Sequence, residues 1–193
     1  MRDRITAYFD TLDRVTRNAE CTTANGETLS LGEAFERVRD MAHATHDRGD
    51  KIMFIGNGGS AAISSHMATD FSKNGGLRSM TFNEGSALTC LGNDLGYENV
   101  FAKQIEWHGR PGDLVIAISS SGRSPNIIKG VEAARAQSCS IITLSGFSQD
   151  NPLRNKGAVN FYVRSPEYGF VELAHQALIH AILDLDRGWR PEH

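Results

Sequence analysis

The sequence predicts an α/β protein in which short buried strands alternate with helices. Two segments carry this pattern most clearly: an apolar run, then a glycine- or serine-rich turn, then apolar residues at helical spacing. They run from Lys51 to Phe71 and from Leu114 to Ala134, and a third apolar strand follows at 140–144. Strands that are apolar on both faces are typical of a parallel sheet covered by helices.

Composition limits the classes of protein that remain. The 193 residues suit a single domain, and 20 Lys and Arg balance 23 Asp and Glu, so we expect no nucleic-acid partner and no membrane partner. No apolar run approaches the roughly 20 residues of a membrane span, and the first residues lack the apolar core of a signal peptide. Three scattered cysteines, Cys21, Cys90 and Cys139, favour a reduced compartment. The sequence indicates a soluble cytoplasmic protein.

Two helices are expected before the first of these strands. Residues 2–17 place apolar side chains on one side of a helix, and 22–30 form a polar turn. The segment from Ser30 to Glu33 has the form of a capping box, and the helical pattern continues to Thr45. Because these helices lie outside the repeated pattern, we interpret them as a packing or oligomerisation element.

The first strand, 51–55, leads into the loop Gly56-Asn-Gly-Gly-Ser60. Its glycines allow a tight turn and close approach to a ligand, and Ser60 is a candidate cap for the next helix. On that helix His66 and Asp70 are four residues apart and share a face. Such a pair holds a metal ion or places an acid beside a base, although a surface hydrogen-bonded pair is the commoner alternative.

The middle of the chain gives weaker signals. Asn74-Gly-Gly76 ends the helix, and segments 80–82 and 87–91 are of uncertain type. Asn93 or Asp94 is expected to cap a helix whose apolar stripe covers 97–105.

The strand 114–118 runs into Ser119-Ser-Ser-Gly122, and Ser124-Pro125 then begins a helix. A strand, a hydroxyl-rich turn and a helix N-terminus are the parts of an anion site. No lysine completes a P-loop and the turn is not Gly-x-Gly-x-x-Gly, so its neutral hydroxyls fit a sugar phosphate better than a nucleotide. An ordinary serine-rich turn is the alternative. Because carboxyl ends of parallel strands share an edge, both loops are expected to face one crevice.

The C-terminal part contains a loop over 147–157, a weak strand at 159–163 that we place at the sheet edge, and a closing helix over 169–187. This helix carries Glu172 with two histidines. His175 is three residues from Glu172 and His180 is eight, so spacing slightly prefers His175 as its partner without deciding.

Together, Gly56–Ser60, the Gly92-Asn-Asp94 step, Ser119–Ser124 and the terminal helix resemble a sugar isomerase (SIS) domain, and within that superfamily the phosphoheptose isomerase family. The resemblance implies a flavodoxin- or Rossmann-like three-layer sandwich with a five-stranded parallel sheet. It implies one SIS domain over 1–193, with the helices of 1–48 used in oligomer packing and an α/β core over 49–193. It also implies a homotetramer with active sites between subunits.

The resemblance also assigns roles to residues. Asp70 and His180 would be the catalytic acid/base groups. Zinc, one per subunit, would bind where some family members hold it, at His66, Asp70, Glu172 and His180. The residues that would contact the substrate, with the serines holding its phosphate, are Asn57, Gly58, Gly59, Ser60, Asp94, Ser119, Ser120, Ser121, Ser124 and Glu172.

Two departures from the family stand out, because Asp70 and Glu172 replace the usual glutamate and glutamine. The residues just before Glu172 also match poorly, and Gly169 lies near the place of an aspartate that family members carry. A shorter carboxylate at 70 shifts a reacting group, and a misplacement of about 1 Å costs on the order of 10²-fold in rate. The extra carboxylate at 172 suits a dication such as zinc.

The expected function is therefore an aldose–ketose isomerase. It would convert sedoheptulose 7-phosphate to D-glycero-D-manno-heptose 7-phosphate through an enediol, in bacterial heptose synthesis for lipopolysaccharide or capsule. The alternatives are a non-catalytic SIS scaffold that binds the replication initiator protein and an isomerase for a different phosphorylated ketose. His66, the carboxylate at 70 and His180 favour an enzyme, because a scaffold does not need them.

Overall fold

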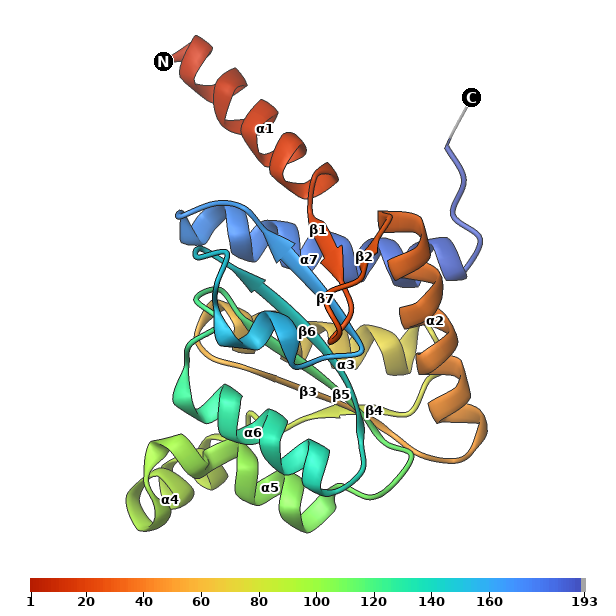
Figure 1. Ribbon diagram of the computed structural model, residues 1–193, viewed down its shortest axis with the longest axis vertical. Helices are drawn as coiled ribbons and strands as arrows, with labels where there is room; N and C mark the ends of the chain where they lie inside the picture. Colours follow the sequence, from red (N-terminus) through yellow and green to blue (C-terminus); the bar gives the residue numbers. More distant parts are fainter. Residues whose placement is uncertain (192–193) are drawn as a thin grey trace.

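The computed structural model describes residues 1–191, which form three layers around one mixed sheet (Figure 1). The strand order is β2-β1-β7-β6-β5-β3-β4. The strands are β1 Glu20–Thr22, β2 Thr28–Leu29, β3 Ile52–Gly56, β4 Ser79–Thr81, β5 Leu114–Ser119, β6 Ser140–Gly146 and β7 Val159–Val163. The α-helices are α1 Arg2–Arg17, α2 Leu31–Asp47, α3 Gly59–Lys73, α4 Gly85–Leu95, α5 Val100–His108, α6 Pro125–Ala136 and α7 Tyr168–Asp186. Two short 3-10 helices are η1 Tyr97–Asn99 and η2 Pro152–Asn155.

The five strands β4, β3, β5, β6 and β7 pair in parallel, which confirms the predicted parallel core. The antiparallel hairpin β1–β2 extends this core to seven strands. It lies where the sequence predicts only a polar turn, because its strands are too short and polar to show alternation. Since β1 pairs with the outer side of β7, the prediction that 159–163 lies at the sheet edge is wrong.

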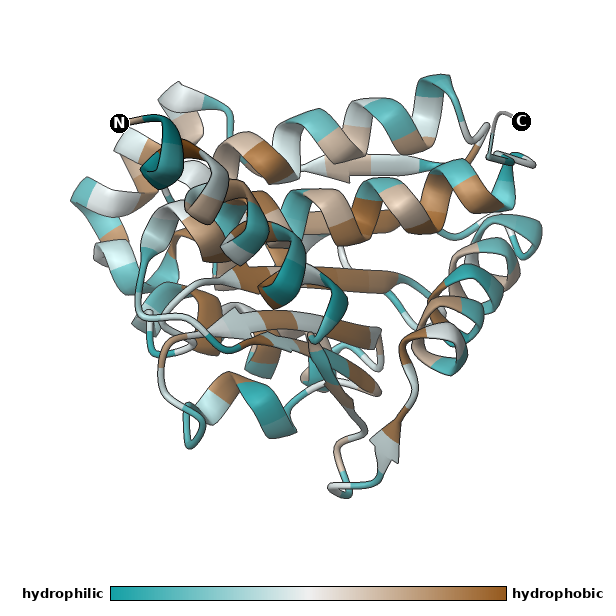
Figure 2. Cartoon of the chain, turned by 90° about the horizontal axis from the view of Figure 1, so that it is seen from above, coloured by the Kyte–Doolittle hydropathy of each residue, from teal (hydrophilic) through white to brown (hydrophobic). Residues whose placement is uncertain are grey.

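Helices cover both faces of the sheet, and each face has its own apolar cluster (Figure 2). On one face α2, α3 and α7 bury side chains that include Ala34, Met67 and Leu178. On the other, α5 and α6 bury Phe101 and Val131. The central strands are apolar toward both clusters, as the sequence predicts for a sheet covered on both sides.

The two N-terminal helices differ in how far they are buried. Helix α2 caps itself with the predicted capping box of Ser30 and Glu33 and contributes Val38 and Ala42 to the core. Helix α1 projects from the body, contacts α7 and buries Val15 (Figure 1). Only α1 therefore stands outside the α/β core.

Three helix starts test the capping predictions. Helix α6 begins at Pro125 after Ser124, as predicted. The predictions for Ser60 and for 93–94 are wrong: α3 starts at Gly59 after Gly58, and Asn93 and Asp94 lie in the last turn of α4. Helix α4 also settles 87–91 as helical, and its N-cap is Glu84, whose carboxylate accepts two backbone N–H bonds.

The three cysteines are free thiols, with Cys21 and Cys139 buried and Cys90 exposed. Within residues 1–191 no helix has both the length and the apolar character to cross a membrane.

Candidate active site

The glycine loop after β3 brings three segments into contact. A Cβ atom at Gly56 would collide with the backbone of Ser60, so the turn requires glycine there. Gly58 has a φ of 53°, in the left-handed region, and directly precedes α3. A Cβ atom at Gly59 would collide with the carboxylate of Glu172, which comes from α7. The loop therefore lets α7 approach the N-terminus of α3.

A reciprocal pair of amide hydrogen bonds fixes Asn57 within this loop. Its Nδ2 donates to Oδ1 of Asn126 at 2.8 Å, and Nδ2 of Asn126 donates back at 2.8 Å. Asn126 is buried in the first turn of α6, and the Tyr97 hydroxyl also donates to Asn57 at 3.2 Å. The two loops that the sequence places at one edge of the sheet are thus directly joined.

The serine loop after β5 satisfies most of its own polar groups. The N–H of Gly122 donates to the carbonyl of Ser119 at 3.0 Å and to its hydroxyl at 3.2 Å. The hydroxyls of Ser119 and Ser124 lie 3.3 Å apart, and that of Ser121 accepts a backbone N–H. Ser120 differs, because its Oγ is buried and has no hydrogen-bond partner within residues 1–191. An unpaired buried hydroxyl marks a position that a ligand can satisfy.

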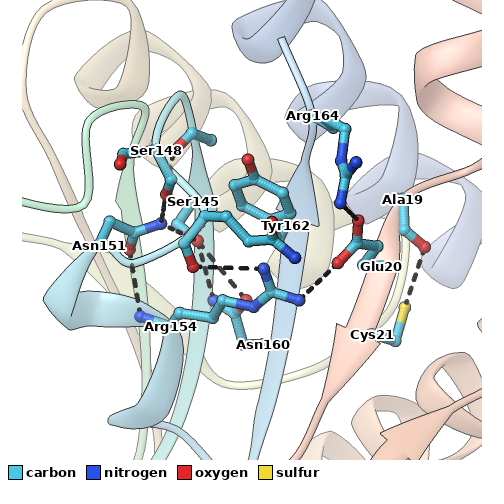
Figure 3. A network of polar contacts seen from close by, with 12 residues as sticks. Ala19, Glu20, Cys21, Ser145, Ser148, Asn151, Arg154, Asn160, Tyr162 and Arg164 are labelled. Atoms are coloured by element: carbon cyan, nitrogen blue, oxygen red, sulfur yellow. Dashed lines mark hydrogen bonds and ion pairs between the residues drawn. The ribbon is translucent and has the colours of Figure 1, made fainter.

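The segment after β6 contacts the serine loop through Asn151, and Figure 3 shows the hydrogen bonds that hold Asn151 in place. Asn151 lies so close to Gly122 that a Cβ atom there would collide with its amide, and the carbonyl of Gly122 accepts the N–H of Leu153 at 3.2 Å. Nδ2 of Asn151 donates to the carbonyl of Ser148 at 2.8 Å and to Oγ of Ser145 at 3.3 Å. The loop therefore rests on a buried polar network that limits its movement.

Further along this network, an arginine ties the β1–β2 hairpin to the sheet (Figure 3). The guanidinium of Arg154 lies 4.4 Å from the ring centroid of Tyr162 and 2.6 Å from Glu20, which also pairs with Arg164 at 2.8 Å. Burial raises the pKa of the Glu20 carboxyl, but the two arginines outweigh burial and leave that pKa below its usual value. This cluster is structural and explains how so short a hairpin stays attached.

The two loops and the start of α7 enclose a pocket of about 230 Å³. It is lined by Asn57, Gly58, Gly59, Ser60, Ile118, Ser119, Ser120, Ser121, Ser124, Tyr168 and Glu172. None of these described residues is a lysine or an arginine. Ser124 makes no side-chain cap on α6, Pro125 has no N–H, and the N–H of Ile127 already donates to the carbonyl of Ser124 and to Oδ1 of Asn126. The positive end of the helix dipole and the unpaired hydroxyl of Ser120 together suit a phosphate group.

A second cluster lies further along α3 and α7. Nε2 of His66 is 3.1 Å from Nε2 of His180 and 3.4 Å from Oδ2 of Asp70, and Nδ1 of His180 is 3.8 Å from the same oxygen. Ligand atoms of the three residues all lie within 4.8 Å of one another. Two imidazoles and a carboxylate are a donor set that zinc accepts, leaving a coordination position for substrate. The three residues therefore fit a metal ion.

The pocket and this cluster occupy successive stretches of the same two helices. His66 follows Ser60 by six residues on α3 and His180 follows Glu172 by eight on α7, which corresponds to about 9 to 12 Å along a helix. Glu172, the fourth metal ligand implied by the resemblance, lies in the pocket against Gly59 and outside the group of three. Helices α3 and α7 thus each contribute residues to the pocket and to the histidine cluster.

His175 has a different position from the other two histidines. It is fully buried, and its Nε2 lies 3.0 Å from the carbonyl of Ser145, so this nitrogen carries the proton. Burial lowers the pKa of His175 to about 4. Helical spacing slightly prefers His175 as the partner of Glu172, but the structure places it within the core and brings His180 to the titratable cluster.

Asp94 lies apart from the pocket in the described residues. It is exposed at the end of α4, where its carboxylate accepts bonds from Nδ2 of Asn93 at 2.7 Å and from the thiol of Cys90 at 3.5 Å. The contact of Asp94 with the sugar chain stays a prediction.

Sequence reasoning missed Asn126 and Tyr168. Asn126 follows the motif Ser124-Pro125 and reads as an ordinary first-turn residue, although its amide is what joins the loops. Tyr168 lines the pocket from the first residue of α7, and nothing in its local pattern distinguishes it from a surface aromatic. The roles of Asn126 and Tyr168 depend on contacts between distant segments, which local sequence pattern does not show.

Comparison with known proteins gives consistent results. Residues 22–146 match the model of the SIS domain. The phosphoheptose isomerase of Rhodospirillum rubrum is 39% identical over 137 residues, which cover 66% of this chain and 73% of that protein. The phosphoheptose isomerase of Yersinia pestis is 33% identical over 187 residues, covering 92% of this chain and 95% of that protein.

Solved structures agree with the sequence comparison. Phosphoheptose isomerase from Neisseria gonorrhoeae superposes with a TM-score of 0.80 at 30% identity, covering 95% of this chain and 98% of that chain. A phosphoheptose isomerase from Francisella tularensis gives 0.82 at 24% identity, with 97% and 98% covered. The NanR protein of Vibrio vulnificus, solved with ManNAc-6P, gives 0.69 at 16% identity, with 96% and 61% covered. The last two likenesses concern the fold alone.

Proposed function

This chain belongs to the SIS-domain family of phosphoheptose isomerases, and from that premise we propose that it converts sedoheptulose 7-phosphate to D-glycero-D-manno-heptose 7-phosphate through an enediol. The observation that carries the proposal is the arrangement of an anion-type pocket and a titratable cluster along the same pair of helices. The pocket holds the phosphate, and the cluster of His66, Asp70 and His180 performs proton transfer.

The phosphate binds at the serine loop. Ser120 donates its unpaired hydroxyl, and the N-terminus of α6 adds the partial positive charge of its dipole. The hydroxyls of Ser119, Ser121 and Ser124 shape the turn and reorient toward the phosphate. Because none of the described lining residues is a lysine or an arginine, binding is moderate and product leaves readily. Phosphate binding fixes the end of the sugar that does not react.

The reacting end lies at the histidine cluster. The offset of about 9 to 12 Å along α3 and α7 is comparable to the length of an extended seven-carbon chain. Asn57, Gly58, Gly59, Ser60 and Glu172 line the path, and Asp94 would join them. A substrate anchored at its phosphate therefore presents its carbonyl near His66, Asp70 and His180.

Asp70 and His180 share the proton transfers. In the ketose-to-aldose direction a base removes a proton from C1 and an acid protonates the C2 carbonyl oxygen, which gives the enediol. The proton on the C1 oxygen is then lost as C2 is protonated, so the reaction only moves protons. Asp70 lies beside both imidazoles, and a carboxyl group and an imidazole each accept and donate protons, so either direction is accessible.

Zinc fits the same cluster, one ion per subunit. His66, Asp70 and His180 would hold it, with Glu172 as the further ligand that the family resemblance implies. The ion would polarise the carbonyl and stabilise negative charge on the enediolate oxygen. A residue that binds the metal is a poorer free base. Metal binding and proton transfer therefore compete at Asp70 and His180.

The proposal extends to assembly and location. The projecting α1 exposes Ile5 and Phe9, which suits contact with other copies in a homotetramer that places sites between subunits. We place the enzyme in the cytoplasm, where it supplies heptose for lipopolysaccharide or capsule. A nearly balanced charge supports the absence of nucleic-acid partners.

Turnover of sedoheptulose 7-phosphate tests this function. Asp70→Asn and His180→Ala are each expected to lower kcat by about 10² to 10⁴-fold, because each removes an acid/base group. Ser72→Ala, an exposed change on the same helix as Asp70, should leave kcat unchanged.

Undiminished rates in both site variants would contradict the assignment of these groups. A panel of phosphorylated pentoses and modified heptoses, with metal analysis by mass spectrometry, tests the substrate and the zinc. Turnover of another ketose alone would replace sedoheptulose 7-phosphate as the substrate.

A further inference from the structure

One side chain in the pocket differs in chemistry from the hydroxyl and amide groups around it. Among the described residues that line the pocket, Tyr168 is the single aromatic one, and it is 61% exposed. Within the described residues 1–191 its hydroxyl takes part in no hydrogen bond. An aromatic ring that remains open at the mouth of a polar pocket offers apolar surface that a ligand can cover.

The ring of Tyr168 is held in place although it is exposed. Its edge meets the ring of Phe147, with centroids 4.7 Å apart and planes at 84°. Phe147 follows β6 with a φ of 56°, which is uncommon for a bulky residue and costs conformational energy. Its N–H donates to Ser165 at 3.1 Å and its carbonyl accepts the hydroxyl of Tyr162 at 2.9 Å, so the strained conformation is held from both sides.

The first turns of α7 are fixed just as firmly. A Cβ atom at Gly146 would lie 2.7 Å from Val171, so helix and strand end are in the closest possible contact. His175, one turn further, bonds to the carbonyl of Ser145. Tyr168 therefore stands on a rigid base at a fixed position relative to the serine loop.

We propose that the ring of Tyr168 is the wall against which the carbon chain of the phosphorylated sugar packs, which makes Tyr168 a specificity-determining residue of this pocket. The inference rests on the proposed function, since it takes an open-chain sugar phosphate as the ligand. Such a chain carries hydroxyls on some sides and C–H groups on others. Ser60, Asn57 and Glu172 contact the hydroxyls, and the ring covers the C–H groups.

This arrangement separates two contributions to binding. The serine loop holds the phosphate and does not depend on Tyr168, whereas the ring contacts carbon and adds affinity only for phosphates that carry a chain. Recognition of chain length and of the C–H face is therefore assigned to Tyr168, and recognition of charge to the serine loop.

Calorimetric binding of two probes tests the assignment. One probe is the alditol of sedoheptulose 7-phosphate, which has no carbonyl and does not isomerise, and the other is inorganic phosphate. Tyr168→Ala is expected to weaken alditol phosphate binding about tenfold while leaving inorganic phosphate binding unchanged. Tyr168→Phe, which keeps the ring, should bind both probes as the unmodified protein does.

Trp107→Ala is the matched control, because Trp107 is equally exposed at 61% but lies on α5 away from the pocket. The inference is overturned if Tyr168→Ala binds the alditol phosphate normally, if Tyr168→Phe loses as much affinity as Tyr168→Ala, or if both probes weaken equally. Neither probe is turned over, so these results are independent of the isomerase assay. Absence of turnover by the unmodified enzyme would contradict the proposed function alone.

Discussion

At the amino ends of β3 and β5 buried charges have full sets of partners, whereas at the carboxyl ends of the parallel strands several buried polar atoms have none among the described residues. Asp113, fully buried before β5, accepts bonds from Nζ of Lys51 at 2.6 Å and from the N–H groups of Lys51 and Arg110, each at 2.9 Å. Asp50 beside it pairs with Arg48 and Arg110.

At the carboxyl ends three side-chain atoms are buried without a partner among the described residues: Oδ1 of Asn83 after β4, Oγ of Ser120 after β5 and Nδ1 of His175 beside the end of β6. A fourth such atom, Oγ1 of Thr22, lies in the antiparallel strand β1, outside the parallel core. Folding alone favours satisfying such groups, since each unpaired one costs about 1 to 3 kcal/mol. The difference indicates that the amino end is arranged for stability and that the carboxyl end keeps capacity for a ligand.

The largest effect on stability is expected at the amino end. Asp113→Ala leaves Lys51 and two backbone N–H groups without their acceptor in a buried place, and it should lower the free energy of unfolding by about 3 to 5 kcal/mol. Asp13→Ala, which breaks an exposed pair with Arg17, should cost less than about 1 kcal/mol. Urea denaturation measures both, and similar losses in the two variants would contradict the comparison.

His175 tests whether every unpaired atom at the carboxyl end belongs to the ligand site. Burial lowers its pKa to about 4 from the ordinary value of 6.5. Between these values the unfolded chain binds the proton and the folded chain does not, so the free energy of unfolding falls as pH drops from 6.5 toward 4. The expected loss across this window is about 3 kcal/mol.

Urea titrations at a series of pH values measure this loss. His175→Gln keeps a donor for the carbonyl of Ser145 and removes the titrating group, so it should flatten the profile. His108→Gln, at an exposed position on α5, should keep the slope of the unmodified protein. An unchanged slope in His175→Gln would show that other groups cause the acid sensitivity.

The sequence predicts the parts of this molecule that local pattern controls. The apolar strands, the helices after them, the capping box at Ser30 and the Ser124-Pro125 start of α6 all follow from residue types at short spacing. The β1–β2 hairpin escapes prediction because its stability comes from Arg154 and Tyr162, far along the chain. Short-range sequence pattern therefore predicts the individual helices and strands, whereas the strands added at the sheet edge depend on contacts between distant segments.

The site shows the same division. Both loops and the pair His66 and Asp70 are visible as motifs, and His180 enters only through family resemblance, since spacing prefers His175. Which serine remains unpaired depends on how the turn closes on Ser119, and sequence carries no signal for it. The roles of individual hydroxyls require coordinates even where the motif is plain.

The smallest effect on stability, and the sharpest test of the comparison, is expected for Ser120→Ala. Because the Ser120 hydroxyl is buried without a partner, its removal should leave the free energy of unfolding unchanged or raise it by up to about 1 kcal/mol. Inorganic phosphate should nevertheless bind about tenfold more weakly, since the hydroxyl is available to the anion. Ser145→Ala is the matched control: its Oγ accepts bonds from Asn151 and Asn160, so it should lose about 1 kcal/mol and keep phosphate affinity. If Ser120→Ala instead destabilises the fold and binds phosphate normally, the Ser120 hydroxyl stabilises the core. It is then not a hydrogen-bonding group kept free for a ligand, and the comparison fails at this residue.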